Sequence, residues 1–120
     1  MEPVEKHVEG SLLLATYGAL LTDAQRALME LYYNEDLSLH EIAEEQGISR
    51  QGVHDVLTRS LRKLERYEAR LGLLKQSAQR AEALSRCLTL ARACPEGGER
   101  DALVQSLERM IHEEEQPNGV

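Results

Sequence analysis

A group of basic and amide side chains in the middle of the chain has the chemistry needed to bind nucleic acid. Arg50, Gln51 and His54 fall on outward positions of a predicted helix that begins after Ser49. Side chains of these types hydrogen-bond to base edges in the major groove. The same helix continues as a stripe of cations, made of Arg59, Arg62, Lys63, Arg66 and Arg70. At the helical step of 100° per residue the stripe spans an arc of about 100°, from which it can contact phosphates.

The stripe has a second interpretation that involves no nucleic acid. Its cations could form a solvated helix face in which they pair with neighbouring acidic residues. Arg62 and Glu65 are three residues apart, a spacing at which opposite charges pair along a helix. Two residues also weaken base reading. Gly52 loosens the first turn by about 1 kcal/mol relative to alanine, and Asp55 carries a negative charge towards the phosphates, although it can accept a hydrogen bond from cytosine N4.

Residues 38–56, which read SLHEIAEEQGISRQGVHDV, contain the signals that would position this helix. Ser38 and Glu41 are spaced as a capping box at the start of a short helix. Gly47 stands where that helix must end, at a position suited to a left-handed backbone. Ile48 would fill the corner, and Ser49 can cap the next helix. This order of signals predicts a helix-turn-helix.

The rest of the chain also has helical periodicity, and no alternating strand pattern occurs. In a helix over residues 4–20, one apolar face contains Val8, Leu12, Ala15 and Ala19. Leu13, Leu14 and Tyr17 widen this face, so the helix is expected to pack on more than one side. Thr22 and Gln25 form a second capping box before the next helix. The helix that starts at residue 50 extends to Leu71, and Gly72 marks a break.

Two further helices are expected over residues 73–94 and 99–115, separated by a turn at residues 95–98 that contains proline and two glycines. We therefore predict an elongated all-α fold with a helix-turn-helix domain over residues 1–72, winged-helix-like or a related form. Residues 73–120 would form a helical hairpin extension that serves as a dimerisation arm.

The dimer prediction comes from a weak heptad seam in the extension. Apolar residues recur at heptad positions that suit a partner helix. The predicted interface consists of Leu74, Ala81, Leu84, Leu88 and Ala91, together with Leu107 of the last helix. A homodimer is expected, but the spacing leaves open whether the hairpin closes within one chain or across two.

Composition restricts the class of protein. The chain has 120 residues with 20 Leu, 12 Ala and no Phe or Trp, so its core must be aliphatic. The formal net charge of −7 argues against a protein that coats nucleic acid non-specifically. An acidic N-terminal segment is unlike a signal peptide, and no apolar run approaches membrane length. Cys87 and Cys94 are expected as free, buried thiols in a reducing compartment, so the predicted location is the cytoplasm.

Enzymatic chemistry is not predicted. The four histidines, His7, His40, His54 and His112, have no His or Cys partner at a metal-binding helical spacing. No stretch matches a nucleophile elbow or a phosphate-binding loop. We therefore expect no catalytic residue, no metal and no cofactor.

Residues 17–73 resemble the YlxM family of small bacterial helix-turn-helix proteins, which are similar in turn to region four of sigma factors. The distinguishing blocks read ALLTDAQ, LYYNEDLSL and EIAEEQGISRQ. The resemblance implies a role with the signal recognition particle, through the particle's RNA or its GTPase. Carried over residue by residue, the matching recognition-helix positions are Arg50, Gln51, Val53 and Asp55. The helical arm of family members also implies a homodimer.

Three functions stay open at this point. The leading hypothesis is an accessory or regulatory component of the signal recognition particle pathway that binds RNA between Arg50 and Arg70. The second is a DNA-binding transcription regulator, whose dimer would place two recognition helices about 34 Å apart. The third is a protein-interaction scaffold that has lost nucleic-acid binding and acts through the apolar seam of residues 73–120.

Overall fold

The computed structural model describes residues 4–115, and every regular element within them is a helix. The prediction of an all-α fold is therefore confirmed. Because a wing is a β-hairpin and this part of the chain contains no strand, the helix-turn-helix here is the purely helical form. The chain divides into two compact units, of which the first ends at Gly72 and the second begins at Leu73.

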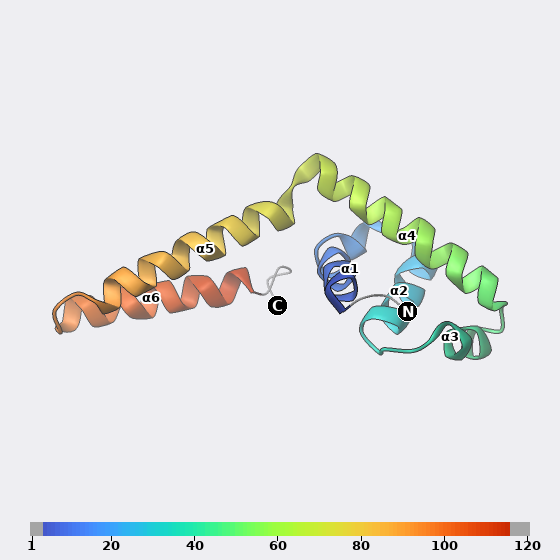
Figure 1. Ribbon diagram of the computed structural model, residues 1–120, viewed down its shortest axis with the longest axis horizontal. Coiled ribbons are helices and arrows are strands. Elements are labelled where there is room, and N and C mark those ends of the chain that lie inside the picture. Colours follow the sequence, from blue (N-terminus) through green and yellow to red (C-terminus); the bar gives the residue numbers. More distant parts are fainter. Residues whose placement is uncertain (1–3, 116–120) are drawn as a thin grey trace. The chain divides into compact units, whose positions relative to one another are not determined.

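The first unit is a bundle whose longest helix contacts the three other α-helices. Its elements in chain order are α1 (Val4–Tyr17), the short 3₁₀ helix η1 (Gly18–Leu20), α2 (Asp23–Tyr33), α3 (Leu39–Gln46) and α4 (Arg50–Leu71). α4 packs against α1, α2 and α3, and Figure 1 shows these three helices gathered along one face of α4. The other face of α4 is left to solvent.

Side-chain caps fix the helix starts that the sequence predicted. The Thr22 hydroxyl accepts a hydrogen bond from the Gln25 amide (3.2 Å), and the Gln25 side chain accepts one from the Thr22 amide. Ser38 and Glu41 form the same reciprocal pair at the start of α3. Hydrogen bonds from the Ser38 amide and then its hydroxyl group lower the pKa of Glu41. Both predicted capping boxes are confirmed.

The core of the first unit is mainly aliphatic. Its buried hydrophobic residues are Leu13, Leu14, Tyr17, Leu21, Leu28, Met29, Tyr33, Ile42, Ala43, Val53, Leu57 and Leu64. Ser60 is buried among them on α4. Burial of these side chains supplies the main favourable free energy of folding.

The predicted buried face of the first helix was wrong in part. Val8 and Leu12 are about half exposed, at 51% and 46%, whereas Leu13, Leu14 and Tyr17 are buried. The difference arises because α1 packs against both α2 and α4. These contacts decide which apolar residues of α1 are buried, whereas the apolar pattern alone allows more than one buried face. The helix also ends earlier than predicted, with residues 18–20 forming the 3₁₀ turn η1.

The close packing of α1 on α2 leads to a prediction for Gly10. A Cβ atom added at Gly10 would lie 2.5 Å from the ring atoms Cε1 and Cζ of Tyr33. Alanine normally stabilises a helix interior by about 1 kcal/mol relative to glycine. Here we expect Gly10→Ala to lower the free energy of unfolding by about 1–3 kcal/mol, because the Tyr33 ring must move.

Denaturant unfolding followed by circular dichroism measures this effect. Gly98→Ala is the matched control, because a Cβ atom at Gly98 meets no atom within 4 Å, and it should be neutral or slightly stabilising. A Gly10→Ala protein as stable as the wild type would contradict the packing of α1 described here.

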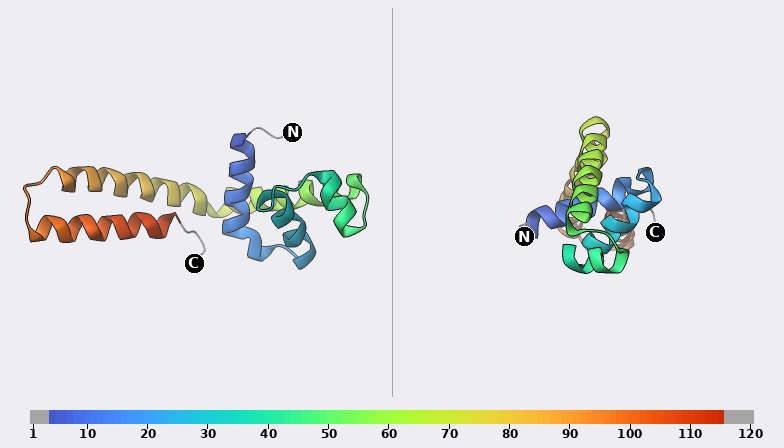
Figure 2. Two further views of the ribbon diagram at one scale, coloured as in Figure 1. Left: turned by 90° about the horizontal axis from the view of Figure 1, so that it is seen from below. Right: turned by 90° about the vertical axis from the view of Figure 1, so that its right-hand side faces the viewer.

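The second unit is a hairpin of two helices, α5 (Leu73–Arg92) and α6 (Gly98–Glu114). They run antiparallel and side by side, as Figures 1 and 2 show. Near the open end, Arg80 Nε and the Ser77 hydroxyl donate hydrogen bonds to the Glu114 carboxylate at 2.6 and 2.7 Å. These bonds, the Arg80 bond first, lower the pKa of Glu114. The hairpin thus closes within one chain, which the sequence left open.

Candidate nucleic-acid interface

The turn between α3 and α4 sets the start of the candidate recognition helix. Gly47 has the predicted left-handed backbone (φ 69°), and its amide donates to the Ala43 carbonyl group at the end of α3. The Ser49 hydroxyl then accepts a hydrogen bond from the Gly52 amide at 2.9 Å, which caps α4. Ile48 was predicted to fill the corner, but it is 43% exposed, so it covers the corner only in part.

The three predicted base-reading residues are all exposed at the start of α4. Arg50, Gln51 and His54 lie within its first five residues. Gln51 Nε2 donates a hydrogen bond to Asp55 Oδ1 at 2.9 Å, and His54 Nδ1 lies 3.8 Å from the same oxygen. Gln51 and His54 are thus gathered around a carboxylate, so this turn of α4 presents hydrogen-bond acceptors as well as donors.

The stripe of cations lies on the solvent-facing part of α4. Four of its members are exposed and Lys63 is half-buried. The buried residues Val53, Leu57 and Leu64 occupy the other side of the helix. Arg59 Nε reaches back to the Asp55 carbonyl oxygen at 3.4 Å, which leaves the charge of its guanidinium group without a counter-charge.

No ion pair within residues 4–115 neutralises these cations. Arg50 and the five stripe residues have no carboxylate partner in that range, and the predicted alternative pair between Arg62 and Glu65 does not form. Arginines on other helices do pair, as Arg26 does with Glu30 (3.1 Å) and Arg86 with Glu82 (2.9 Å). Unpaired, clustered cations are the electrostatic feature expected of a surface that binds phosphates.

Charge is unevenly distributed over the first unit. α4 carries six Arg or Lys residues against three acidic ones, whereas residues 4–49 carry two against nine. A polyanion is therefore attracted to the outer face of α4 and repelled by α1, α2 and α3. Glu44 and Glu45 on α3 are exposed, and they raise the energy of a duplex that would lie across both helices of the motif.

A contact that the sequence did not predict ties α1 to the distal half of α4. The Tyr17 hydroxyl donates a hydrogen bond to Glu68 Oε1 at 2.6 Å, and Tyr17 is 1% exposed. The Tyr17 and Tyr67 rings lie 6.0 Å apart. Tyr17 and Glu68 are 51 positions apart, so no local pattern could have indicated the pair. It holds the α4 segment that carries Arg62, Lys63 and Arg66 against the core.

The residues predicted as a dimer interface lie in the hairpin. Ala91 and Leu107 are buried, and Leu74, Ala81, Leu84 and Leu88 are half-buried. Because α5 and α6 pack on each other within one chain, this seam has a role inside the hairpin. Its role between two copies stays a prediction.

A metal-binding cluster and a membrane-spanning helix are both absent from the part of the chain that the structure describes. Residues 4–115 hold no group of three or more His, Cys, Asp and Glu side chains placed to bind a metal ion. None of the helices in that range is long and apolar enough to cross a membrane. Cys87 and Cys94 are free thiols, but both are exposed, so the prediction that they are buried was wrong.

A short helix joined at a left-handed glycine to a longer helix, whose outer face is exposed and cationic, defines a helix-turn-helix protein. Residues 4–93 match the UPF0122 family, described as helix-turn-helix protein, YlxM / p13 like. Because this match covers most of the chain, the chain belongs to the UPF0122 family, and the resemblance seen in the sequence is confirmed.

Curated relatives support this membership. The UPF0122 protein YlxM of Bacillus subtilis is 41% identical over 107 residues, which cover 89% of this chain and 97% of the relative. A UPF0122 protein of Desulforamulus reducens is 42% identical over 96 residues, covering 80% of this chain and 82% of the relative. Since both matches extend beyond residue 73, the similarity includes part of the hairpin as well as the helix-turn-helix.

Proposed function

We propose that this chain is a non-enzymatic, cytoplasmic accessory or regulatory component of the signal recognition particle pathway, and that it binds the particle's RNA through α4. The observation that carries the proposal is the set of exposed or half-exposed cations along α4 that have no ion-pair partner within residues 4–115, namely Arg50 at its start and the stripe of Arg59, Arg62, Lys63, Arg66 and Arg70 on its outer face. The choice of the signal recognition particle is supported by the resemblance to YlxM proteins.

In this proposal the two parts of α4 have different tasks. The stripe from Arg59 to Arg70 contacts backbone phosphates, which supplies salt-sensitive affinity. Arg50, Gln51 and His54 contact exposed base edges, as proteins do in single-stranded loops and bulges of RNA. RNA is favoured over an operator because Asp55 and the acids of α3 lie where a duplex backbone would pass in the usual docking of this motif.

A DNA-binding regulator is the second candidate, and the helix-turn-helix geometry itself favours it. Selection of bound sequences from random duplex DNA distinguishes the two, because a regulator enriches a sequence and an RNA-binding protein of this kind does not. The proposal includes a homodimer formed through residues 73–120, as the heptad spacing predicts.

A three-way titration tests the choice of partner. The protein is titrated with the RNA of the particle, with its GTPase alone, and with duplex DNA of random sequence. The proposal expects saturable binding to the RNA at lower protein concentration than to the duplex. Binding to the GTPase alone, unaffected by salt, would instead support a protein-interaction scaffold.

Removing the acid at the centre of the interface gives a prediction of its own. Asp55 is exposed on the face that carries the cations, so its charge opposes phosphate binding. We expect Asp55→Asn to raise RNA affinity about twofold to fivefold, the range typical of one exposed charge interaction. Fluorescence anisotropy with labelled RNA measures this change.

Glu65→Gln is the matched control, since it removes the same charge from the same helix at a position about 80° around the axis from Asp55. Its effect should be smaller. Equal gains from both substitutions would mean that only the total charge of α4 matters, and that RNA does not approach the face centred on Asp55.

A further inference from the structure

The hairpin buries very little of its apolar surface. Ala91 and Leu107 are the only buried hydrophobic residues in the described range 73–115, whereas Leu90, Leu103 and Met110 are 70%, 48% and 47% exposed. Two helices of this size do not form a stable core by themselves, because helical stability in proteins comes mostly from packing an apolar face. The exposed apolar residues therefore indicate a surface that a further element covers.

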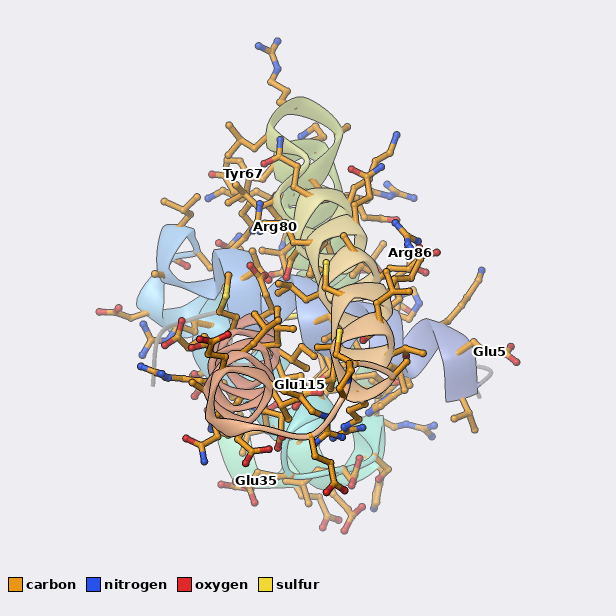
Figure 3. The ribbon with its side chains drawn as sticks, turned by 90° about the vertical axis from the view of Figure 1, so that its left-hand side faces the viewer. Glu5, Glu35, Tyr67, Arg80, Arg86 and Glu115 are labelled. Carbon is orange, nitrogen blue, oxygen red and sulfur yellow. The ribbon has the colours of Figure 1, made fainter. Side chains whose placement is uncertain are left out.

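On α5 a second stripe of small and apolar residues contains the half-buried Ala83 and the exposed Cys87 and Leu90. Ala83, Cys87 and Leu90 fall within an arc of about 60° at 100° per residue. This arc is turned by roughly 110° from the stripe that packs on α6, which consists of Ala81, Leu84, Leu88 and Ala91. The same step places Arg86 opposite α6, and Figure 3 shows this arginine pointing away from α6.

α6 repeats the arrangement. Leu103, Ser106 and Met110 also fall within an arc of about 60°. On α6 the stripe that contains the buried Leu107 packs on α5. The arc is turned from that stripe by roughly 100°, in the same rotational sense as on α5.

The two arcs lie on one side of the hairpin. When two right-handed helices run antiparallel, residues turned in the same sense from the contact stripe fall on the same side of the plane through both axes. Arg92 and Glu108 are both turned the other way, and they approach each other to 3.7 Å on the opposite side. We call the first surface the apolar side, made of Ala83, Cys87, Leu90, Leu103, Ser106 and Met110.

We propose that a second copy of this chain packs on the apolar side, so that two hairpins form a four-helix bundle. This inference deepens the proposed homodimer and does not depend on what α4 binds. Its six residues carry no charge, and Glu99, in the first turn of α6, is the one charged residue that falls within the same arcs. Over most of its length the surface can therefore meet itself without repulsion of like charges. A twofold contact of this kind also closes, leaving neither copy with an uncovered apolar side. The small residues Ala83 and Ser106 permit close approach of the helices.

The size of the surface fits a weak dimer. With 20 residues in α5 and 17 in α6, the helices are about 30 and 25 Å long, and two helices side by side are about 20 Å wide. The side therefore offers roughly 550 Å² in projection. Stable interfaces bury about 600–1,000 Å² per partner, so we expect a dissociation constant on the order of micromolar.

Sedimentation equilibrium of the full chain tests the inference. The wild type should pass from monomer to dimer between about 1 and 100 µM. Leu90→Glu and Met110→Glu should each raise the dissociation constant more than tenfold, because each places a charge in the contact. Thr89→Glu and Gln105→Glu are matched controls on exposed positions of the opposite side, and both should still dimerise.

A second measurement guards against variants that fail to fold. In an otherwise wild-type chain with Cys94→Ser, Cys87 is the only thiol, and its rate of alkylation should fall several-fold as the protein concentration rises. A wild-type chain that stays monomeric at 100 µM would overturn the proposal, as would a Cys87 rate independent of concentration. A dimer that the control substitutions disrupt as strongly as Leu90→Glu would also overturn it.

Discussion

Replacing Arg59, Arg62 and Arg66 together by alanine is expected to weaken RNA binding by about 100-fold at moderate salt. The three side chains are exposed, lie close together on the outer face of α4, and have no ion-pair partner in residues 4–115. Hydrogen bonds to charged groups contribute about 1.5–3 kcal/mol each when buried, and less at an exposed surface. A total loss near 3 kcal/mol therefore corresponds to roughly two orders of magnitude in affinity.

The salt dependence of the same variant reports the mechanism. Each phosphate contact contributes about 0.7–0.9 to the slope of log affinity against log salt concentration. Loss of three contacts should reduce the magnitude of that slope by about 2. The fold should be unaffected, because none of the three arginines is buried.

A matched variant separates the position of the charges from their number. Arg26, Arg86 and Arg109 are also exposed arginines, and they lie on α2, α5 and α6. Their combined replacement by alanine changes the net charge equally, so it should weaken RNA binding only a fewfold. If both triple variants lose the same affinity, α4 is not the binding surface.

The second large effect is expected from Leu64→Ala, which should lower the free energy of unfolding of the first unit by about 3 kcal/mol. Leu64 is 0% exposed on the buried face of α4. Replacement of a fully buried leucine by alanine removes favourable burial and leaves a cavity, which costs about 2–5 kcal/mol. For a unit of this size, the melting temperature should fall by more than 10 °C.

Tyrosine fluorescence makes this measurement specific. All four tyrosines, Tyr17, Tyr32, Tyr33 and Tyr67, lie in the first unit, and the chain has no tryptophan. Unfolding followed by this signal therefore reports the helix-turn-helix unit without the hairpin. Leu61→Ala is the control, because Leu61 is only half-buried on the same helix. Equal losses at both positions would contradict the burial pattern of α4.

Local signals in the sequence predicted the helix-turn-helix because its determinants are local. A cap needs residues three apart, as with Ser38 and Glu41, and the end of α3 needs one glycine with a left-handed backbone, Gly47. These interactions do not depend on the rest of the fold. The sequence therefore located the helix starts correctly and placed the end of α4 at Gly72, which has φ 64°.

Features that depend on packing between distant segments were not predictable. The apolar pattern of α1 allows more than one buried face, and contact with α2 and α4 decides between them. Ser60 is polar and yet fully buried, and its hydroxyl has no partner within the described residues. Both outcomes depend on neighbours that a single sequence does not identify.

For the candidate interface, periodicity placed the cations on one exposed arc, but it could not say whether they are neutralised. That depends on side-chain positions. Among residues 4–115 the structure shows ion pairs on α2 and α5 but none for the cations of α4. The heptad seam predicted that α5 packs on a partner helix. Its spacing is the same for a partner helix in the same chain as for one in another copy, so the sequence could not distinguish these two arrangements.

Titration of the particle's RNA with the wild-type protein over a series of salt concentrations decides whether the cations of α4 recognise RNA. Binding should be saturable, and log affinity should fall linearly with log salt concentration, with a slope of roughly −4 for five or six phosphate contacts. Absence of saturable binding, or an affinity that salt does not change, would contradict RNA recognition by the cations of α4.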